Sequence, residues 1–140
     1  MSEKMDGFAP RIFPLLVALA IGFFLFVLWI IIDADQGNPN IFLTWVRSIP
    51  YGDKFGHFGI FGLLTLLVTL ATRCRQIRLL GLRCYLGAVL VAVFAVAEEC
   101  TQSLFPTRTF DLGDLTADAL AIALVVVALK IWQKSRIGTS

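Results

Sequence analysis

The feature that most restricts the fold of this chain is an uncharged run of 21 residues, 12–32. As a helix with a rise of about 1.5 Å per residue, such a run spans the roughly 30 Å hydrocarbon core of a bilayer. The run is longer than the apolar segment of a cleaved signal peptide, and no A-x-A cleavage site follows it. We therefore expect residues 12–32 to form a retained membrane anchor.

Three more apolar runs follow, at about residues 55–72, 79–100 and 112–132. Hydrophobic residues make up 58% of the 140 residues, and the mean hydropathy is +0.82. A soluble domain of this length cannot bury that much apolar surface. The sequence predicts an all-α fold, in which one domain (residues 1–140) of a polytopic membrane protein packs four transmembrane helices into a small bundle.

Basic residues are concentrated on one side of this predicted topology. Nine of the twelve lie in the N-terminal segment, the second connection and the C-terminal segment. Because cytoplasmic loops are rich in Lys and Arg, we expect both termini in the cytoplasm and the chain in the inner (plasma) membrane. The net charge of +2 hides this asymmetry and does not indicate nucleic acid as a partner. The nine residues are Lys4, Arg11, Arg73, Arg75, Arg78, Arg83, Lys130, Lys134 and Arg136.

Polar groups interrupt the apolar pattern at the start of the second predicted helix, in the sequence GDKFGHFG. Asp53 and His57 are one helical turn apart, so the aspartate could hold the imidazole in one tautomer. The alternative is that Asp53 and Lys54 are charges at the membrane interface and that His57 is a polar cap.

A second polar segment, AEECTQSLFPTRTFDLGDLTADALA, joins the last two predicted helices. Glu99 and Gln102 are three residues apart and share a helix face, whereas Glu98 is turned away from Glu99 by about 100°. Arg108 follows in the short connection, where it suits an anionic head group.

Three aspartates at spacings of three and four, Asp111, Asp114 and Asp118, form a stripe into the last predicted helix. Helix capping and the helix dipole account equally well for Asp111 and Asp114. Asp118 lies one turn deeper, where an acid must find a partner or become protonated, and such residues are functional candidates. Glu99 is a candidate on the same ground.

Alternating helix directions bring these segments to one face of the membrane, which predicts a polar pocket open to the extracytoplasmic side. A structural network that ties three helices together is the alternative. The candidate catalytic residues are His57, Glu99, Asp114 and Asp118. The candidate substrate-binding residues are Asp53, Lys54, Gln102, Arg108 and Asp111.

Two further patterns concern packing. Four glycines at spacings of four, three and three place small residues on one side of the second helix, where another helix of the chain or of a partner can approach. The glycines are Gly52, Gly56, Gly59 and Gly62.

The first connection has the sequence NPNIFLTWVRSIP, in which Asn40 is a candidate N-cap and which ends at Pro50. This pattern predicts a short interfacial segment, and an irregular loop is the alternative.

The cysteines and the histidine give no clear cofactor signal. The three cysteines lack the spacing of a metal site, and the chain has one histidine. We expect no cofactor, although one histidine with several carboxylates leaves a divalent metal open.

The segments DKFGHFGIFGLL and EECTQSLFPTRTFDLGDLTADALA together resemble the VanZ-like family of integral membrane proteins. The family pattern is D-K-x-x-H, then E-x-x-Q, an arginine, and D-x-x-D leading to an asparagine, and it matches about residues 50–125. The resemblance favours Glu99 over Glu98, because only Glu99 has Gln102 three residues later. Two positions depart: Asp118 stands at the usual asparagine, and Ala121 at a common glycine. The matching positions are Asp53, Lys54, His57, Glu99, Gln102, Arg108, Asp111 and Asp114.

The family's named member is associated with resistance to the glycopeptide teicoplanin, so the resemblance implies work on the cell envelope. It suggests an envelope lipid or a lipid-linked cell-wall precursor as the ligand. An enzyme would use the candidate acids and bases, a non-catalytic binding protein would need only the pocket, and a scaffold subunit would use the glycines. The sequence leaves these three hypotheses open.

Overall fold

The computed structural model describes residues 12–38 and 40–137. The described chain is mostly helical, as predicted. Lys4 and Arg11, which contribute to the predicted orientation, lie outside the described residues. The elements are α1 (Ile12–Asp35), α2 (Ile41–Ser48), α3 (Gly52–Ala71), β1 (Gln76–Leu79), β2 (Leu82–Tyr85), α4 (Leu86–Gln102) and α5 (Leu112–Ile137).

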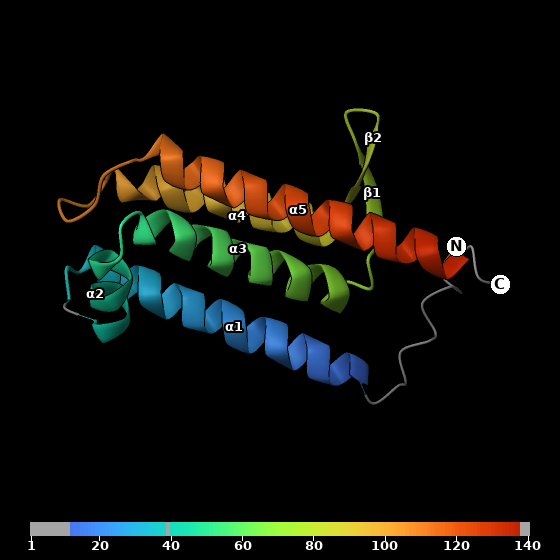
Figure 1. The fold of residues 1–140 in the computed structure, drawn as a ribbon, viewed down its shortest axis with the longest axis horizontal. Helices are drawn as coiled ribbons and strands as arrows, with labels where there is room; N and C mark the ends of the chain where they lie inside the picture. Colours follow the sequence, from blue (N-terminus) through green and yellow to red (C-terminus); the bar gives the residue numbers. More distant parts are fainter. Residues whose placement is uncertain (1–11, 39, 138–140) are drawn as a thin grey trace.

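The four long helices lie lengthwise beside one another (Figure 1). Helix α2 lies at one end of the bundle, and the hairpin formed by β1 and β2 projects near the other end. Helix α3 is the central element, because it packs against α1, α2, α4 and α5. Phe61 and Leu64 of α3 form a buried cluster with Val91 and Ala95 of α4. In a bilayer, such contacts stabilise a bundle by close packing rather than by exclusion of water.

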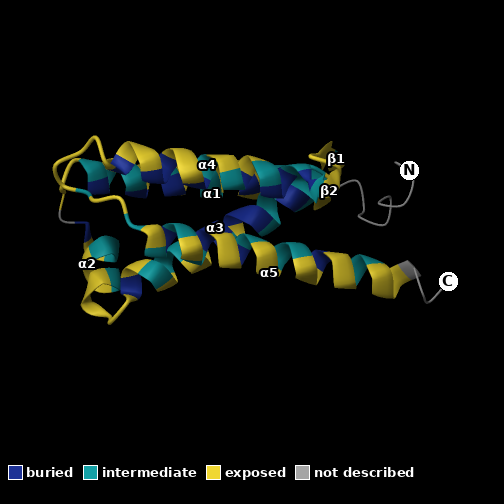
Figure 2. Cartoon of the chain, turned by 90° about the horizontal axis from the view of Figure 1, so that it is seen from above, coloured by how far each residue is buried: buried dark blue, intermediate teal, exposed yellow. Residues whose placement is uncertain are grey.

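Three helices of the described chain are long and apolar enough to cross a membrane: α1, α3 and Leu112–Arg136 of α5. They coincide with the predicted runs at 12–32, 55–72 and 112–132. Helix α4 has 17 residues and is about 25 Å long, a little less than the hydrocarbon core. Exposed residues run along α4 and α5 (Figure 2), and those on α5 include Leu124 and Val127. This outward apolar surface is typical of a chain surrounded by lipid.

Residues 76–85 form an antiparallel hairpin, so the prediction of a purely α-helical fold with a third helix starting at residue 79 is wrong here. Leu79 pairs with Leu82, and the turn residues Leu80 and Gly81 both have positive φ, 50° and 82°. Positive φ at both positions matches the twist of paired strands. The leucines around Gly81 prolong the apolar run and conceal this turn, and α4 begins only at Leu86.

Helix α2 confirms a short ordered segment in the first connection, with Asn40 as its N-cap. The Asn40 side chain accepts a hydrogen bond of 2.8 Å from the Phe42 N–H, as an N-cap does. The Asn40 amide also donates to Asp33 at 2.8 Å, which fixes the start of α2 against the end of α1. The helix ends at Ser48, before Pro50.

The glycines of α3 serve packing within the chain, at two different helices. A Cβ atom at Gly52 would overlap the carbonyl oxygen of Val46 in α2, and one at Gly56 would meet the Val46 side chain at 3.4 Å. At Gly62 the neighbour is Ala121 of α5, at 3.5 Å, whereas Gly59 faces open space. Gly52, Gly56 and Gly62 therefore let α2 and α5 approach α3 closely.

Candidate functional site

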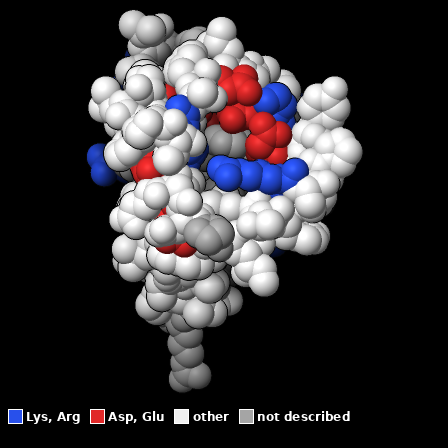
Figure 3. All heavy atoms as spheres, turned by 90° about the vertical axis from the view of Figure 1, so that its left-hand side faces the viewer, with Lys and Arg blue, Asp and Glu red and all other residues white. Residues whose placement is uncertain are grey.

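A pocket of about 620 Å³ lies between the helices at the end of the bundle where α2 packs. Its apolar wall comes mainly from α1 and α2, with Val27, Ile30 and Phe42 among the lining residues. Charged side chains gather on this end of the molecule, with uncharged residues around them (Figure 3). The residues with ionisable or amide side chains that line the pocket are Arg47, Tyr51, Asp53, His57, Glu98, Gln102, Arg108, Asp111 and Asp114.

The ammonium group of Lys54 lies among three carboxylates. Its Nζ atom is 2.8 Å from Asp111, 3.1 Å from Asp114 and 3.3 Å from Asp53. Lys54 thereby links the start of α3 to the start of α5. The Lys54 ammonium lowers the pKa of Asp111, and the N–H of Gly113, which donates to the same carboxylate, adds to this effect.

His57 is held between two aspartates of α5. Its Nδ1 atom lies 3.1 Å from Asp118, whose side chain is 1% exposed, and its Nε2 atom lies 3.7 Å from Asp114. Because a carboxylate only accepts hydrogen bonds, the shorter contact assigns a proton to Nδ1. The ring also stacks on Phe61, with 5.7 Å between centroids, so its orientation is fixed on two sides.

Glu99 is fully buried and joins the end of α4 to the segment before α5. One carboxylate oxygen, Oε1, accepts a hydrogen bond from the backbone N–H of Asp111. The other, Oε2, has no hydrogen-bond partner among the described residues. Asp111 in turn accepts from the Gly113 N–H at 2.6 Å and so caps α5, which confirms the capping alternative for this residue.

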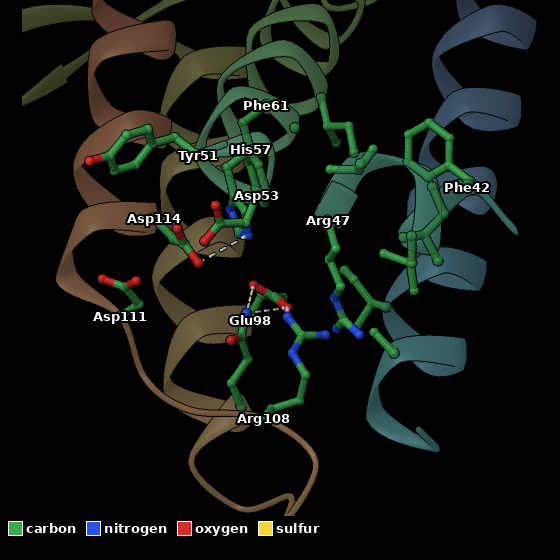
Figure 4. Close-up of a pocket in the computed structure, with 18 of the residues that line it drawn as sticks. Phe42, Arg47, Tyr51, Asp53, His57, Phe61, Glu98, Arg108, Asp111 and Asp114 are labelled. Carbon is green, nitrogen blue, oxygen red and sulfur yellow. Dashed lines mark hydrogen bonds and ion pairs between the residues drawn. The ribbon is translucent and has the colours of Figure 1, made fainter. Parts of the chain in front are cut away.

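Glu98 and Arg108 form a second polar group on the pocket wall. Both Glu98 oxygens accept from the Gln102 amide at 2.8 Å, and the Arg108 guanidinium lies 3.4 Å from Glu98. Arg108 also lies 3.5 Å from Asp35, the last residue of α1. These contacts tie α1 and α4 to the α4–α5 connection. Figure 4 shows the side chains of Glu98 and Arg108 pointing toward each other, below His57 and Asp114 in this view.

The structure brings all nine predicted site residues to this end of the bundle, but with different partners from some of those expected. The carboxylate that holds His57 is Asp118, not Asp53, which contacts Lys54 instead. Gln102 binds Glu98 rather than Glu99.

Sequence reasoning missed two charged residues of the pocket. Glu98 was set aside, yet its spacing of four from Gln102 is an equally good helical signal. Arg47 lines the pocket from α2, and only the N-cap at Asn40 could have indicated that this helix folds over the site.

Two groups in the described part of the chain bring three possible metal ligands close together. One consists of His57, Glu99 and Asp114, and the other of Asp53, Asp111 and Asp114. In each group, one ligand atom per residue lies within 4.8 Å of the others.

Comparison with known protein families, with curated proteins and with solved structures gives no match.

Replacing Lys54 by methionine is expected to lower the melting temperature at neutral pH, because three carboxylates lose their shared counter-ion. The lowered pKa of Asp111 means that this stabilisation is present above the ordinary pKa of an aspartate and is lost as the pH falls through the lowered value. Melting curves of both proteins should therefore converge on acidification. Lys130→Met, at an exposed lysine of α5, is the matched control and should change little. A difference that stays constant at all pH values would contradict the ion-pair explanation.

Proposed function

We propose that the chain is a multi-pass inner-membrane protein in which α4 is a fourth crossing helix, both termini are cytoplasmic and the pocket faces the extracytoplasmic side. The C-terminal end of α5, with Lys130, Lys134 and Arg136, lies at the same end as the hairpin with Arg78 and Arg83 (Figure 1). The carboxylates lie at the other end, so the arrangement follows the positive-inside rule. Local thinning of the bilayer accommodates a helix as short as α4.

The pocket binds an envelope lipid or a lipid-linked cell-wall component. The observation that carries this proposal is the contrast between its two walls, one apolar and one ionisable. Such a site suits a molecule with a hydrocarbon part and a charged head group. Arg47 supports an anionic head group, because it lines the pocket, is exposed and has no ion pair with any described residue. Lys54 and Arg108 already have carboxylate partners.

His57 is the group best placed for proton transfer to or from such a head group. It lines the pocket, and Asp118 orients it from behind, as a base is oriented by a carboxylate in many enzymes. Asp114 lies on the pocket side of the ring. The reaction class is general acid–base chemistry on an envelope lipid.

The alternative is a protein that binds such a lipid without changing it, or that supports an envelope complex. The pairing of the charges supports this alternative, because Lys54 contacts three carboxylates and Arg108 contacts two. A network of this kind ties helices together whether or not chemistry takes place.

The VanZ-like resemblance adds a physiological proposal. A protein that acts on a lipid-linked cell-wall component would change the susceptibility of the cell to glycopeptides such as teicoplanin. This part of the proposal depends on the sequence motifs around His57 and Glu99, not on the pocket.

The test is mass spectrometry of envelope lipids and lipid-linked precursors in a deletion strain, the wild type and strains that express Glu99→Gln or Glu98→Gln at equal level. We expect one species to change in the deletion strain and to change likewise in Glu99→Gln. A species that changes only in the deletion strain would favour binding without catalysis. No change in any strain would contradict a role in lipid chemistry and favour the scaffold.

A further inference from the structure

The three side chains His57, Glu99 and Asp114 come from three different helices and meet at one point behind the pocket wall. Each offers a ligand atom within 4.8 Å of the other two. His57 and Asp114 also line the pocket, so the point is accessible from outside the protein.

One oxygen of this group lacks a partner. Glu99 is 0% exposed, and its Oε2 atom has no hydrogen bond to any described residue. A buried carboxylate oxygen without a partner is costly, because it has lost its water and gained nothing in exchange. A cation at this point would supply the missing interaction.

The contacts of the two ring nitrogens of His57 suit metal binding. Asp118 accepts a hydrogen bond from the Nδ1–H at 3.1 Å, which leaves Nε2 with a free lone pair, 3.7 Å from Asp114. Metal-binding histidines are commonly held in this way, with a carboxylate on the other ring nitrogen. The gap of 3.7 Å between Nε2 and Asp114 is too long for a hydrogen bond. Two zinc ligands in tetrahedral geometry are about 3.4 Å apart, close to this distance.

The neighbouring group of Asp53, Asp111 and Asp114 does not offer a comparable place. The Lys54 ammonium contacts all three of its carboxylates, so a cation already fills it. Asp114 belongs to both groups, but its two oxygens are divided: Oδ1 faces Lys54 and Oδ2 faces His57.

From these observations we infer that His57 Nε2, Glu99 and Asp114 bind a divalent transition-metal ion, with Asp118 as the residue that positions the histidine. A ligand set of one imidazole and two carboxylates suits zinc better than the hard ions Mg²⁺ and Ca²⁺, which prefer oxygen alone. A metal on Nε2 would occupy the ring nitrogen that the acid–base chemistry proposed above needs, because Nδ1 already contacts Asp118. The ion and that chemistry therefore exclude each other at His57, whereas lipid binding in the pocket is compatible with either, and zinc binding is measured on the purified protein without any lipid substrate.

The test is calorimetric titration of ZnCl₂ into the full-length protein in detergent, with any polyhistidine tag removed and metals stripped by a chelator. We expect one zinc per chain, bound at least about 100-fold more tightly than Mg²⁺. Glu99→Gln and His57→Gln should each weaken binding by at least about 30-fold, and Asp118→Asn by about 10–100-fold. Asp53→Asn, in the group filled by Lys54, should change the Kd less than about threefold.

Two results would overturn the assignment. One is equal zinc affinity of the wild type and a folded Glu99→Gln variant. The other is loss of binding in Asp53→Asn but not in Glu99→Gln, which would move the ion to the Lys54 group.

X-ray absorption of zinc bound to the wild type keeps the test valid if a variant fails to fold. It should show one imidazole with oxygen ligands. Sulfur ligands would instead assign the zinc to the cysteines and contradict the site.

Discussion

Replacing Gly52 by alanine is expected to cause the largest loss of stability of any glycine-to-alanine change in α3. The new Cβ atom would overlap the carbonyl oxygen of Val46, and it would lie 2.9 Å from the Val46 carbonyl carbon. Both are backbone atoms of α2, so no side-chain rotation relieves the overlap, and the two helices must separate. Overpacking in a tight contact costs about 1–3 kcal/mol and sometimes more, and we expect the upper end of this range. Thermal unfolding of the purified protein in detergent measures it.

The matched control is Gly59→Ala, in the same helix. No atom lies within 4 Å of a Cβ at Gly59, and alanine favours the helix over glycine by up to about 1 kcal/mol. This variant should melt at or above the wild-type temperature. Equal melting temperatures for Gly52→Ala and Gly59→Ala would show that α2 does not pack on α3 as described.

His57→Gln is expected to have the largest effect on function. If the proposed lipid chemistry takes place, loss of the oriented imidazole should reduce the rate by at least about 100-fold, as is usual when a general acid or base is removed. Glutamine keeps a polar side chain of similar reach, so the pocket and the lipid's affinity should change little. The readout is the amount of the lipid product, measured by mass spectrometry at equal protein levels.

Ser103→Ala is the control for this experiment. Ser103 follows α4 at the same end of the bundle, and its hydroxyl donates to the backbone carbonyl of Cys100. Its removal should leave product formation unchanged. Full activity in His57→Gln would contradict a catalytic role for the imidazole and favour the binding protein.

The helical part of the fold could be predicted because long uncharged runs have few other solutions in a membrane protein. The runs at 12–32, 55–72 and 112–132 match α1, α3 and α5 to within a few residues. The hairpin could not be predicted in the same way. The leucines of the hairpin are as hydrophobic as those of a transmembrane helix. The signals against a helix are Gly81 and the two arginines Arg78 and Arg83.

The location of the candidate site followed from the alternation of helix directions, which needs no knowledge of side-chain contacts. The pairing within the site did not follow. Helical spacing relates residues of one helix, so it led to Asp53 as the partner of His57. The actual partner, Asp118, comes from α5 across the interface, and contacts between helices depend on rotations that the sequence does not specify.

If the proposed anionic head group also reaches Arg108, the two ion pairs of this residue would link head-group affinity to helix spacing. Arg108 connects Asp35 at the end of α1 with Glu98 of α4. An anionic head group that competes with either carboxylate for the guanidinium would weaken the connection between the two helices. By reciprocity, any change in the surrounding lipid that separates α1 from α4 would strengthen binding of that head group by the same factor. The lipid environment would then act as an effector of this protein as well as its solvent.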